Sequence, residues 1–551
     1  MSEFGASATG SRFGCPRCGG GLKYDIASGK LDCDRCGELT ALSAIDDQAL
    51  VNDGTMEVTE FHCPQCGAMV YSTDTSVTGF CSFCGSDVVF TSRMGRTRRP
   101  KAIVPFTVTR EDCEARYREH LKHYHLKPAS MDSAETVSHF RPVYVPFWSY
   151  HVKASGYAEL KGHKNYTKGN YNYDEDYDLS MNAEIDQDHI LYDASTAFED
   201  ETAAMLQHTA AEAVPFHPAY LSGLYAQAAD VAPETYQREA AASAVRMFMD
   251  RVKDEYEMDR VEMIGDSNNA FGLPNAEYTE DLVMMPVWLL AQRHGQRVIY
   301  TAVNGSTGQV ICDIPVSFGR LAAVILGTAA AIFAVLHLFL TLKPEIMMVL
   351  CAALLMISQF QFGGAQTVLN LRRTRAYEPD FAGGRRFVGP AQALLTEKDH
   401  KIQATSGAKL NDGKASKILS YILMGAFAFI FFGGTSLMHK FGSISSSSGG
   451  RFILTLFMLG ALVTLIVHFV VKTKQGGSGP VIPRIVALIA CAAGTLCIAL
   501  GVFEDLVYYA CAAAMLAAAI WELAIIIRAH NEYASRPVPF FESTQEVSVH
   551  D

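Results

Sequence analysis

Eight cysteines occupy four Cys-x-x-Cys pairs in the first 84 residues of the chain. The pairs form two sets, each with 14 residues between its inner cysteines, and the second set repeats the first at an offset of 48 residues. A glycine follows every pair, as suits a tight knuckle with a positive φ. Four thiolates satisfy the tetrahedral preference of zinc. The first set is Cys15, Cys18, Cys33 and Cys36, and the second is Cys63, Cys66, Cys81 and Cys84.

This spacing predicts two structural zinc ions in tandem zinc ribbons, over residues 13–40 and 61–88, joined by a linker at 41–60. Units this small cannot bury enough apolar surface to fold without metal. Because all four ligands of each ion are protein thiolates, no coordination position is left for a catalytic water. A thioredoxin-like redox centre is disfavoured, since it needs a single pair opening a helix. Iron also fits four thiolates, so the residues leave the choice of metal open.

The chain has 551 residues, too long for one ordinary domain, so we expect several units with separate cores. Its formal net charge is -12, from 46 Lys and Arg against 58 Asp and Glu. Nucleic-acid binding requires a concentrated cationic surface, and this balance disfavours it. Nucleic-acid binding stays an alternative function because the chain has the two ribbons and one local run of basic residues. The run contains Arg93, Arg96, Arg98, Arg99 and Lys101.

Long uncharged apolar stretches begin only after residue 317. Each is near the ~20 residues that cross a bilayer, so the sequence predicts an all-α polytopic membrane domain of about six helices. We expect three transmembrane hairpins, over 318–362, 418–471 and 485–528, with a basic loop at 363–417. The individual spans are expected at 319–342, 346–362, 418–438, 452–471, 485–503 and 506–528.

Basic residues gather in the connections 363–417 and 472–484, which predicts that these connections are cytosolic. Both termini are then cytosolic, including the tail 529–551, and the protein is expected in the bacterial inner (plasma) membrane as a multi-pass protein. Residues 1–12 are small and polar without an apolar h-region, so we expect a disordered N-terminus and no signal peptide. Thiols in the cytosol stay reduced, which again favours metal ligation over disulfides.

Three ionisable residues interrupt the apolar stretches: His337, His468 and Glu522. Such residues mark ion pathways in some membrane proteins. Glu522 precedes Arg528 by fewer than two helical turns, and we expect its side chain to reach the membrane interface. Packing and snorkelling are therefore favoured over an ion pathway.

Residues 100–317 combine strand and helix signals and predict a cytosolic α+β domain. Strands are expected around Trp148 and Trp288, whose Pro-x-Trp contexts indicate either a second duplication or edge strands where proline is tolerated. A hairpin turn is expected at 304–308. The tyrosine-rich stretch 157–177 is expected to form exposed strands and loops, and it is a candidate binding surface. Helices are expected near 198–212, 217–228 and 233–256, and one with Cys113, Tyr117, Leu121 and Tyr124 on a single face.

No enzyme motif is present: there is no Gly-x-Ser-x-Gly elbow, no His-Glu-x-x-His and no Walker sequence. Three histidines, His120, His123 and His125, fall close together, but no carboxylate or thiolate is spaced to complete a metal site, so we interpret them as a solvated helix end. The sequence therefore predicts a protein that is not an enzyme.

Five segments, taken in order, resemble bacterial TFIIB-type zinc-ribbon membrane proteins, which are often labelled primosomal or helicase-like. The resemblance implies a membrane-anchored protein with phage-shock-like, SPFH-type or TPM-domain partners in envelope stress. It supplies no catalytic residues. The segments are 13–20, 103–106, 146–148, 218–223 and 286–308.

The main hypothesis from the sequence is a non-enzymatic membrane scaffold, in which zinc ribbons and an α+β domain recruit cytosolic or membrane proteins to the lipid bilayer. The first alternative is a transporter or channel with a zinc-ribbon regulatory domain, and the second is a nucleic-acid-binding membrane protein.

Overall fold

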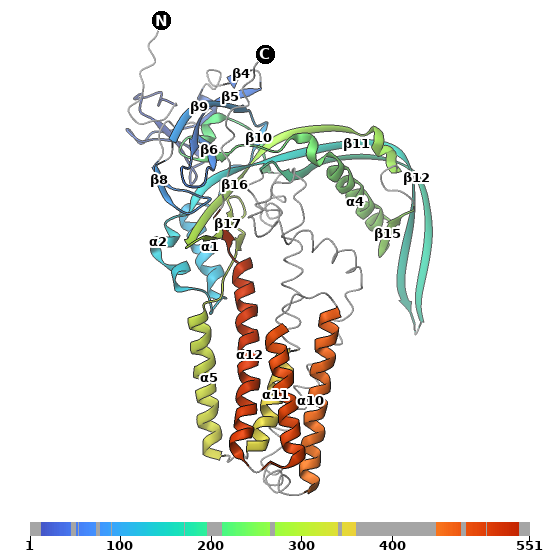
Figure 1. The fold of residues 1–551 in the computed structure, drawn as a ribbon. Coiled ribbons are helices and arrows are strands. Elements are labelled where there is room, and N and C mark those ends of the chain that lie inside the picture. The colour runs from blue at the N-terminus through green and yellow to red at the C-terminus, as the bar shows by residue number, and fades with distance from the viewer. Residues whose placement is uncertain are drawn as a thin grey trace, which may run out of the picture.

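A sheet-rich head lies above a group of apolar helices in the computed structural model (Figure 1). Predictions for the N-terminus 1–12, the loop 363–417 and the span 418–438 lie outside the described residues. The structure describes residues 13–45, 51–52, 54–72, 78–89, 91–169, 171–195, 212–264, 270–339, 344–359, 448–474, 481–502 and 504–538.

Two long antiparallel strands form the centre of the head. Strand β11 (Arg141–Lys168) pairs with β16 (Glu277–His294), and β16 turns into β17 (Arg297–Asn304). Side chains on both faces of β16 are buried, because core clusters cover the sheet on each side. The shorter strands β10 (Ala102–Ile103) and β18 (Val310–Cys312) extend this sheet.

The strands predicted around Trp148 and Trp288 are confirmed, but the interpretation of them as edge strands is wrong. Trp288 pairs with Pro142 on one side and with Val303 on the other, so β16 is central. The turn expected at 304–308 is confirmed, since it joins the antiparallel strands β17 and β18.

Helix α1 (Arg110–Lys122) covers part of the sheet. The Thr109 hydroxyl accepts from the amide of Asp112 and caps the N-terminus. Cys113, Tyr117 and Leu121 are buried at helical spacing, as predicted, whereas Tyr124 lies beyond the helix and is exposed.

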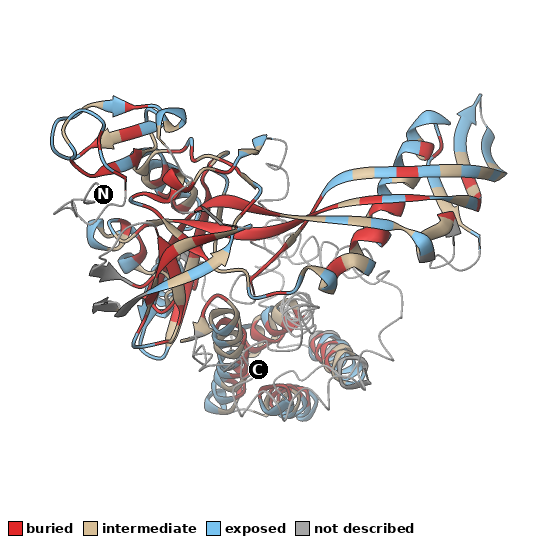
Figure 2. Ribbon diagram, turned by 90° about the horizontal axis from the view of Figure 1, so that it is seen from above, coloured by how far each residue is buried: buried red, intermediate tan, exposed pale blue. Residues whose placement is uncertain are grey.

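The distal part of β11 pairs with β12 (Tyr171–Asp193) in a long hairpin, which we call the arm. The arm curves out of the head and extends sideways beyond the helices (Figure 2). Helix α4 (Gln237–Glu255) and strand β15 (Arg260–Met263) pack against it. Helix α4 and the 3-10 turn before it confirm the helix predicted at 233–256.

The helix predicted near 217–228 is wrong: a 3-10 turn, η4 (Pro218–Leu221), and strand β14 (Tyr225–Gln227) occupy this stretch. Backbone pairing of β14 with β11 and β6 outweighs the local helical pattern. The helix predicted at 198–212 lies almost wholly outside the described residues.

Among the described residues, two helices rather than six are long and apolar enough to cross a membrane: α11 (Val481–Leu500) and α12 (Asp505–Tyr533). Within the described residues, three other expected spans coincide with apolar helical stretches of 10–17 residues. These stretches are Phe318–Ala331 in α5 (Phe318–Phe339), Pro344–Gln359, and Leu454–Val470 in α10 (Ser448–Lys474).

Candidate metal centres

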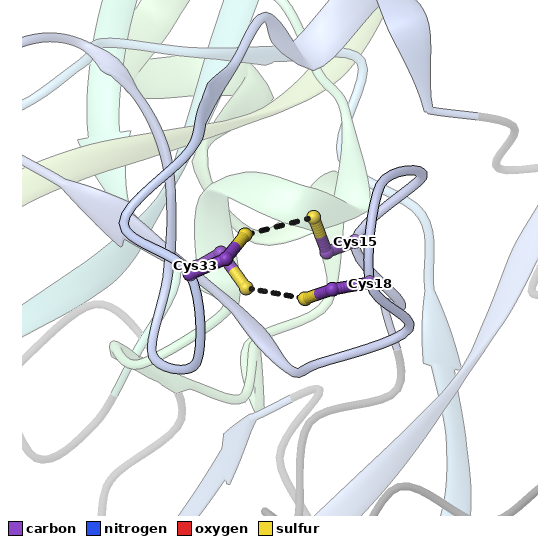
Figure 3. Close-up of side chains that lie close together, drawn as sticks. Cys15, Cys18 and Cys33 are labelled. Carbon is purple, nitrogen blue, oxygen red and sulfur yellow. Dashed lines mark hydrogen bonds between the residues drawn. The ribbon is translucent and has the colours of Figure 1, made fainter.

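The first four-cysteine group lies in a small separate sheet at one end of the head. A knuckle at Cys15 and Cys18 precedes the sheet, and a second at Cys33 and Cys36 connects two of its strands. Figure 3 shows the thiols of both knuckles converging. The three strands are β1 (Leu22–Asp25), β2 (Lys30–Cys33) and β3 (Leu39–Thr40).

The sulfur spacing in this group fits a tetrahedral metal ion. Cys15 Sγ lies 3.8 Å from Cys36 Sγ, and Cys18 Sγ lies 3.5 Å from Cys33 Sγ. A Zn–S bond of about 2.3 Å gives a tetrahedron edge of about 3.8 Å. A backbone hydrogen bond from Cys36 lowers the pKa of the Cys33 thiol to about 7, which favours the thiolate that a metal binds.

The second group is built in the same way. Cys63 Sγ lies 3.8 Å from Cys84 Sγ, and Cys66 Sγ lies 3.8 Å from Cys81 Sγ. All four ligand atoms in each group lie within 4.8 Å of one another. The first pair follows β5 (Thr55–His62) and precedes β6 (Met69–Ser72), and the second lies between β7 (Thr78–Phe80) and β8 (Asp87–Val89).

A glycine closes every knuckle, as the sequence predicts. In the first knuckle the amide of Gly19 donates to the carbonyl of Cys15 at 2.8 Å, and Gly19 has a φ of 68°. The same bond and a positive φ recur at Gly37, Gly67 and Gly85. Only glycine takes this left-handed conformation without strain, which explains its place after each pair.

The two groups differ in their access to solvent. In the second group every cysteine is buried. In the first group Cys36 is exposed and Cys18 is half-buried. A chelator therefore reaches the first group directly and the second only after local opening of the head.

This difference predicts two phases of metal release. We call residues 13–40 ribbon 1 and residues 61–88 ribbon 2. With zinc in both groups, excess chelator should remove one equivalent from ribbon 1 quickly and the second from ribbon 2 much more slowly. The course is followed with a chromogenic zinc indicator. Cys36→Ser serves as the control, since it should abolish only the fast phase; a single phase of two equivalents would contradict the assignment.

Ribbon 2 is joined to the central sheet. Its strands β5 and β6 enter the large sheet through β14. The Tyr300 hydroxyl of β17 donates to the Phe83 carbonyl inside the ribbon, and Arg293 Nη1 donates to Ser86 Oγ at 2.8 Å. Burial, with the cysteine charges nearby, raises the pKa of Tyr300 above its ordinary value, so the phenol stays protonated as a donor.

Ribbon 1 packs against the turn η4. The Ser222 hydroxyl donates to the Leu22 carbonyl at 2.5 Å, and the amide of Tyr24 donates to the Ser222 carbonyl at 2.8 Å. The rings of Tyr24 and Tyr220 lie 5.1 Å apart. Both ribbons are thus fixed parts of the head.

Comparison with known proteins finds a similar chain whose function is not assigned. The chain is 25% identical over 333 residues to the uncharacterized protein YdjG of Bacillus subtilis (strain 168). The matched region covers 59% of this chain and 96% of that relative. No protein-family model and no solved structure matches the chain.

The other residues singled out by sequence do not join a metal-binding group. Within the described part of the chain, the four-cysteine groups are the clusters that could hold a metal ion. His123 and His125 are exposed at the end of α1, in keeping with the solvated helix end expected there. The cationic run has partners inside the chain: Arg96 lies 3.5 Å from Glu57, Arg98 covers the Trp148 ring, and Lys101 lies 2.5 Å from Asp281.

Glu522 does not lie at the membrane interface, where the sequence predicts it; its side chain is completely buried in α12. Arg484 Nε donates to Glu522 Oε1 at 3.1 Å, and Gln359 donates to Glu522 Oε2. The expectation that the Glu522 side chain reaches the membrane interface is therefore wrong, and Arg484 belongs to α11 rather than to a cytosolic connection. A signal was available, because Arg484 lies next to a long apolar run that carries no other cation.

The C-terminal end of α12 forms a second unpredicted feature, a junction with the head. Asn531 Nδ2 donates to the Val316 carbonyl at 2.9 Å, and the Val316 amide donates back to Asn531 Oδ1 at 2.7 Å. Strand β19 (Arg536–Pro537) then pairs with β17, and the Arg536 guanidinium lies 5.2 Å from the centre of the Tyr300 ring. Burial lowers the pKa of Arg536 to about 10.

Proposed function

We propose that the protein is a non-enzymatic scaffold that holds a metal-stabilised head at the cytosolic face of the bacterial inner membrane, where the head recruits other proteins. The apolar helices are the multi-pass anchor, and both termini face the cytosol. The SPFH- and TPM-domain proteins implied by the resemblance are the first partner classes to examine.

The junction between α12 and the head carries this proposal. An anchor joined by a flexible linker would leave the head free to rotate, whereas here a paired amide and an added β-strand fix the helix end to the sheet. The same β17 strand contacts ribbon 2 through Tyr300. A single continuous structure therefore connects the anchor to the buried metal group, as a rigid platform for partners requires.

The metal groups also favour a structural role. Four thiolates around one ion leave no position for a substrate, so the metal would supply stability and shape rather than chemistry. The surface that the two ribbons contribute to the head is then available for protein contacts only if the ribbons are folded. This dependence on folded ribbons supplies the test.

The test is capture of partners with the full-length tagged protein from solubilised membranes, identified by mass spectrometry. The unaltered chain should recover a defined set of proteins, and a variant with both Cys15→Ser and Cys63→Ser should lose them because both ribbons unfold. Cys497→Ser is the matched control, since Cys497 belongs to α11 and to neither metal group.

Metal content and membrane fractionation of each variant are measured in parallel. The double variant should contain no zinc yet remain in the membrane fraction. An unchanged partner list in the double variant would contradict the scaffold function, and recovery of the unaltered protein in the soluble fraction would contradict the anchor.

A transporter or channel is the second candidate, and one specific observation favours it. Ionisable side chains buried among apolar helices are expensive and mark ion or proton paths in many membrane proteins. Glu522 and Arg484 form such a pair, with 0% and 6% of their side chains exposed. Flux of protons or inorganic ions into proteoliposomes that is lost in Glu522→Gln would support it, while equal flux in empty and protein-containing vesicles would contradict it.

A further inference from the structure

The distal arm has two chemically different faces. Residues paired directly across an antiparallel hairpin share one face. Tyr166 pairs with Tyr173, and Lys168 with Tyr171, so these four lie on one side. Glu175 and Tyr177 follow on the same side at alternate positions of β12. We call this side the Tyr face; it consists of Lys164, Tyr166, Lys168, Tyr171, Tyr173, Glu175 and Tyr177.

The opposite side of the arm is acidic. It carries Asp174, Asp176 and Asp178, which pair across the hairpin with Asn165, His163 and Lys161. Asp176 is bound by Lys161 at 3.0 Å and by His163 Nδ1 at 2.6 Å. The two faces of the arm therefore differ in their charge and in their content of aromatic residues.

In the part of the arm nearer the head, helix α4 covers one side of the hairpin, and the Tyr face lies on this same side. Ala154, Ala158 and Leu160 have the same parity on β11 as Tyr166, and they share one buried cluster with Ala240 and Ala244 of α4. The covered part of this side ends at Gly162, where the Met258 side chain occupies the space that a Cβ atom would need. Beyond this point the Tyr face continues without α4.

The tyrosines of this face are open to solvent in the described structure. Tyr171 near the tip is 73% exposed, and Tyr166 and Tyr173 stack with ring centres 5.1 Å apart. The hydroxyls of Tyr177 and Tyr166 donate to Glu175 at 2.6 and 2.9 Å and stabilise its negative charge, and Lys164 lies 3.5 Å from Glu257. Lys168 is exposed beside Tyr171. The end of the face nearest the tip thus consists of tyrosine rings with the cation of Lys168 beside them.

The curvature of the arm brings this end back toward the level of the helices. In Figure 1, α4 lies beneath the arm, on the side of the apolar helices, and the arm tip descends to the height of the upper ends of α5 and α10. Chain connectivity places Lys474 at the upper end of α10. In the proposed topology this height is the cytosolic surface of the membrane.

We propose that the Tyr face at the end of the arm rests on the cytosolic membrane surface and binds anionic phospholipid headgroups, as a second contact beside the helical anchor. This inference rests on the membrane placement of the helices in the proposed function. Tyrosine prefers the headgroup region, where the ring is partly apolar and the hydroxyl stays hydrated. Lysine beside it is attracted by the anionic lipids of the cytosolic leaflet.

A membrane fits this surface better than a protein groove. The acidic side of the arm would be repelled by anionic lipid, and it faces away from the helices. The basic aromatic side faces toward them. Contact at the tip would add a second fixed point to the junction between α12 and the head, as suits a scaffold that presents one surface.

The test uses the full-length protein in nanodiscs of phosphatidylglycerol and phosphatidylethanolamine that contain a radiolabelled phospholipid. The photoreactive residue p-benzoyl-phenylalanine replaces Tyr171 in one sample and Tyr157 in a second. Tyr157 is 54% exposed but has the opposite parity on β11, so it lies on the acidic side. A third sample carries the residue at Leu326, which is 69% exposed on α5.

Lipid adducts are expected at Leu326 and at Tyr171 but not at Tyr157. In the Tyr171 sample, Lys168→Gln should reduce the adduct yield by up to about fivefold in anionic nanodiscs, and replacing the anionic lipid by phosphatidylcholine should act similarly. No adduct at Tyr171, equal adducts at Tyr157, or a protein adduct of twice the chain mass would overturn the arm contact. If Leu326 also gives no lipid adduct, the membrane placement itself is wrong, so the two failures are distinguishable.

Discussion

Cys66→Ser is expected to unfold ribbon 2 and the large sheet of the head, whereas Cys36→Ser should melt ribbon 1 alone. Cys66 is fully buried, and ribbon 2 shares its strands β5 and β6 with the large sheet. A structural zinc contributes about 10–16 kcal/mol of apparent binding free energy. A domain has only about 5–15 kcal/mol of net stability, so the loss of this ion exceeds what the head can absorb.

Cys36 lies in a different setting. It is exposed, and the three strands of ribbon 1 form a sheet separate from the large one. Ribbon 1 contacts the head through packing and a few hydrogen bonds, including the one from Ser222 to Leu22. Its unfolding therefore leaves the hydrogen-bonded framework of the central strands in place.

Metal analysis and thermal unfolding of purified protein check this prediction. Each variant should contain one zinc where the unaltered chain contains two. Cys36→Ser should keep a cooperative unfolding transition, and Cys66→Ser should show none. Cys497→Ser should match the unaltered chain in both measurements. Equal loss of stability in the two ligand variants would contradict the unequal roles of the ribbons, and iron in place of zinc would correct the metal.

The metal groups could be predicted from sequence because the information is local. Each ribbon carries its ligands within a short segment, and the glycine after each pair records the backbone conformation that the knuckle requires. Local patterns also sufficed for α1, where Cys113, Tyr117 and Leu121 recur at helical spacing and are buried.

The packing of the ribbons on the head could not be predicted in this way. Ser222 and Leu22 are 200 positions apart in the chain, and nothing in either segment specifies the other. The same holds for β14, whose pairing with β11 and β6 replaces the helix expected at that stretch. Proline near Trp288 suggested an edge strand, but neighbours on both sides make β16 central.

The apolar half shows a different limit. Hydropathy identified every described helix in it, yet a count of apolar stretches does not say which are long enough to span a bilayer; within the described residues, two helices meet that requirement. A hydropathy profile also scores each charged residue separately, so it does not detect that two distant charges form a pair. Arg484 and Glu522, 38 positions apart, were therefore assigned to a loop and to an interface when they form a buried pair.

Removing either partner of that pair is expected to destabilise the helices by about 3–5 kcal/mol, because the remaining buried charge loses its counter-charge. Glu522→Gln removes the carboxylate that accepts from the Arg484 guanidinium, and Arg484→Met leaves the Glu522 carboxylate with Gln359 as a neutral partner. Thermal unfolding of the full-length protein in detergent measures both losses.

The double variant Arg484→Met with Glu522→Leu distinguishes a paired charge from two independent polar groups. Replacing both members by apolar side chains removes both desolvation penalties, so the double variant should recover most of the stability that each single variant loses. Arg528→Gln is the matched control: its partner Glu532 lies 3.9 Å away and both are exposed, so the change should be within about 1 kcal/mol of neutral. Additive losses in the double variant would mean that the two side chains are not coupled, and the observed contact would then not explain why the bundle retains them.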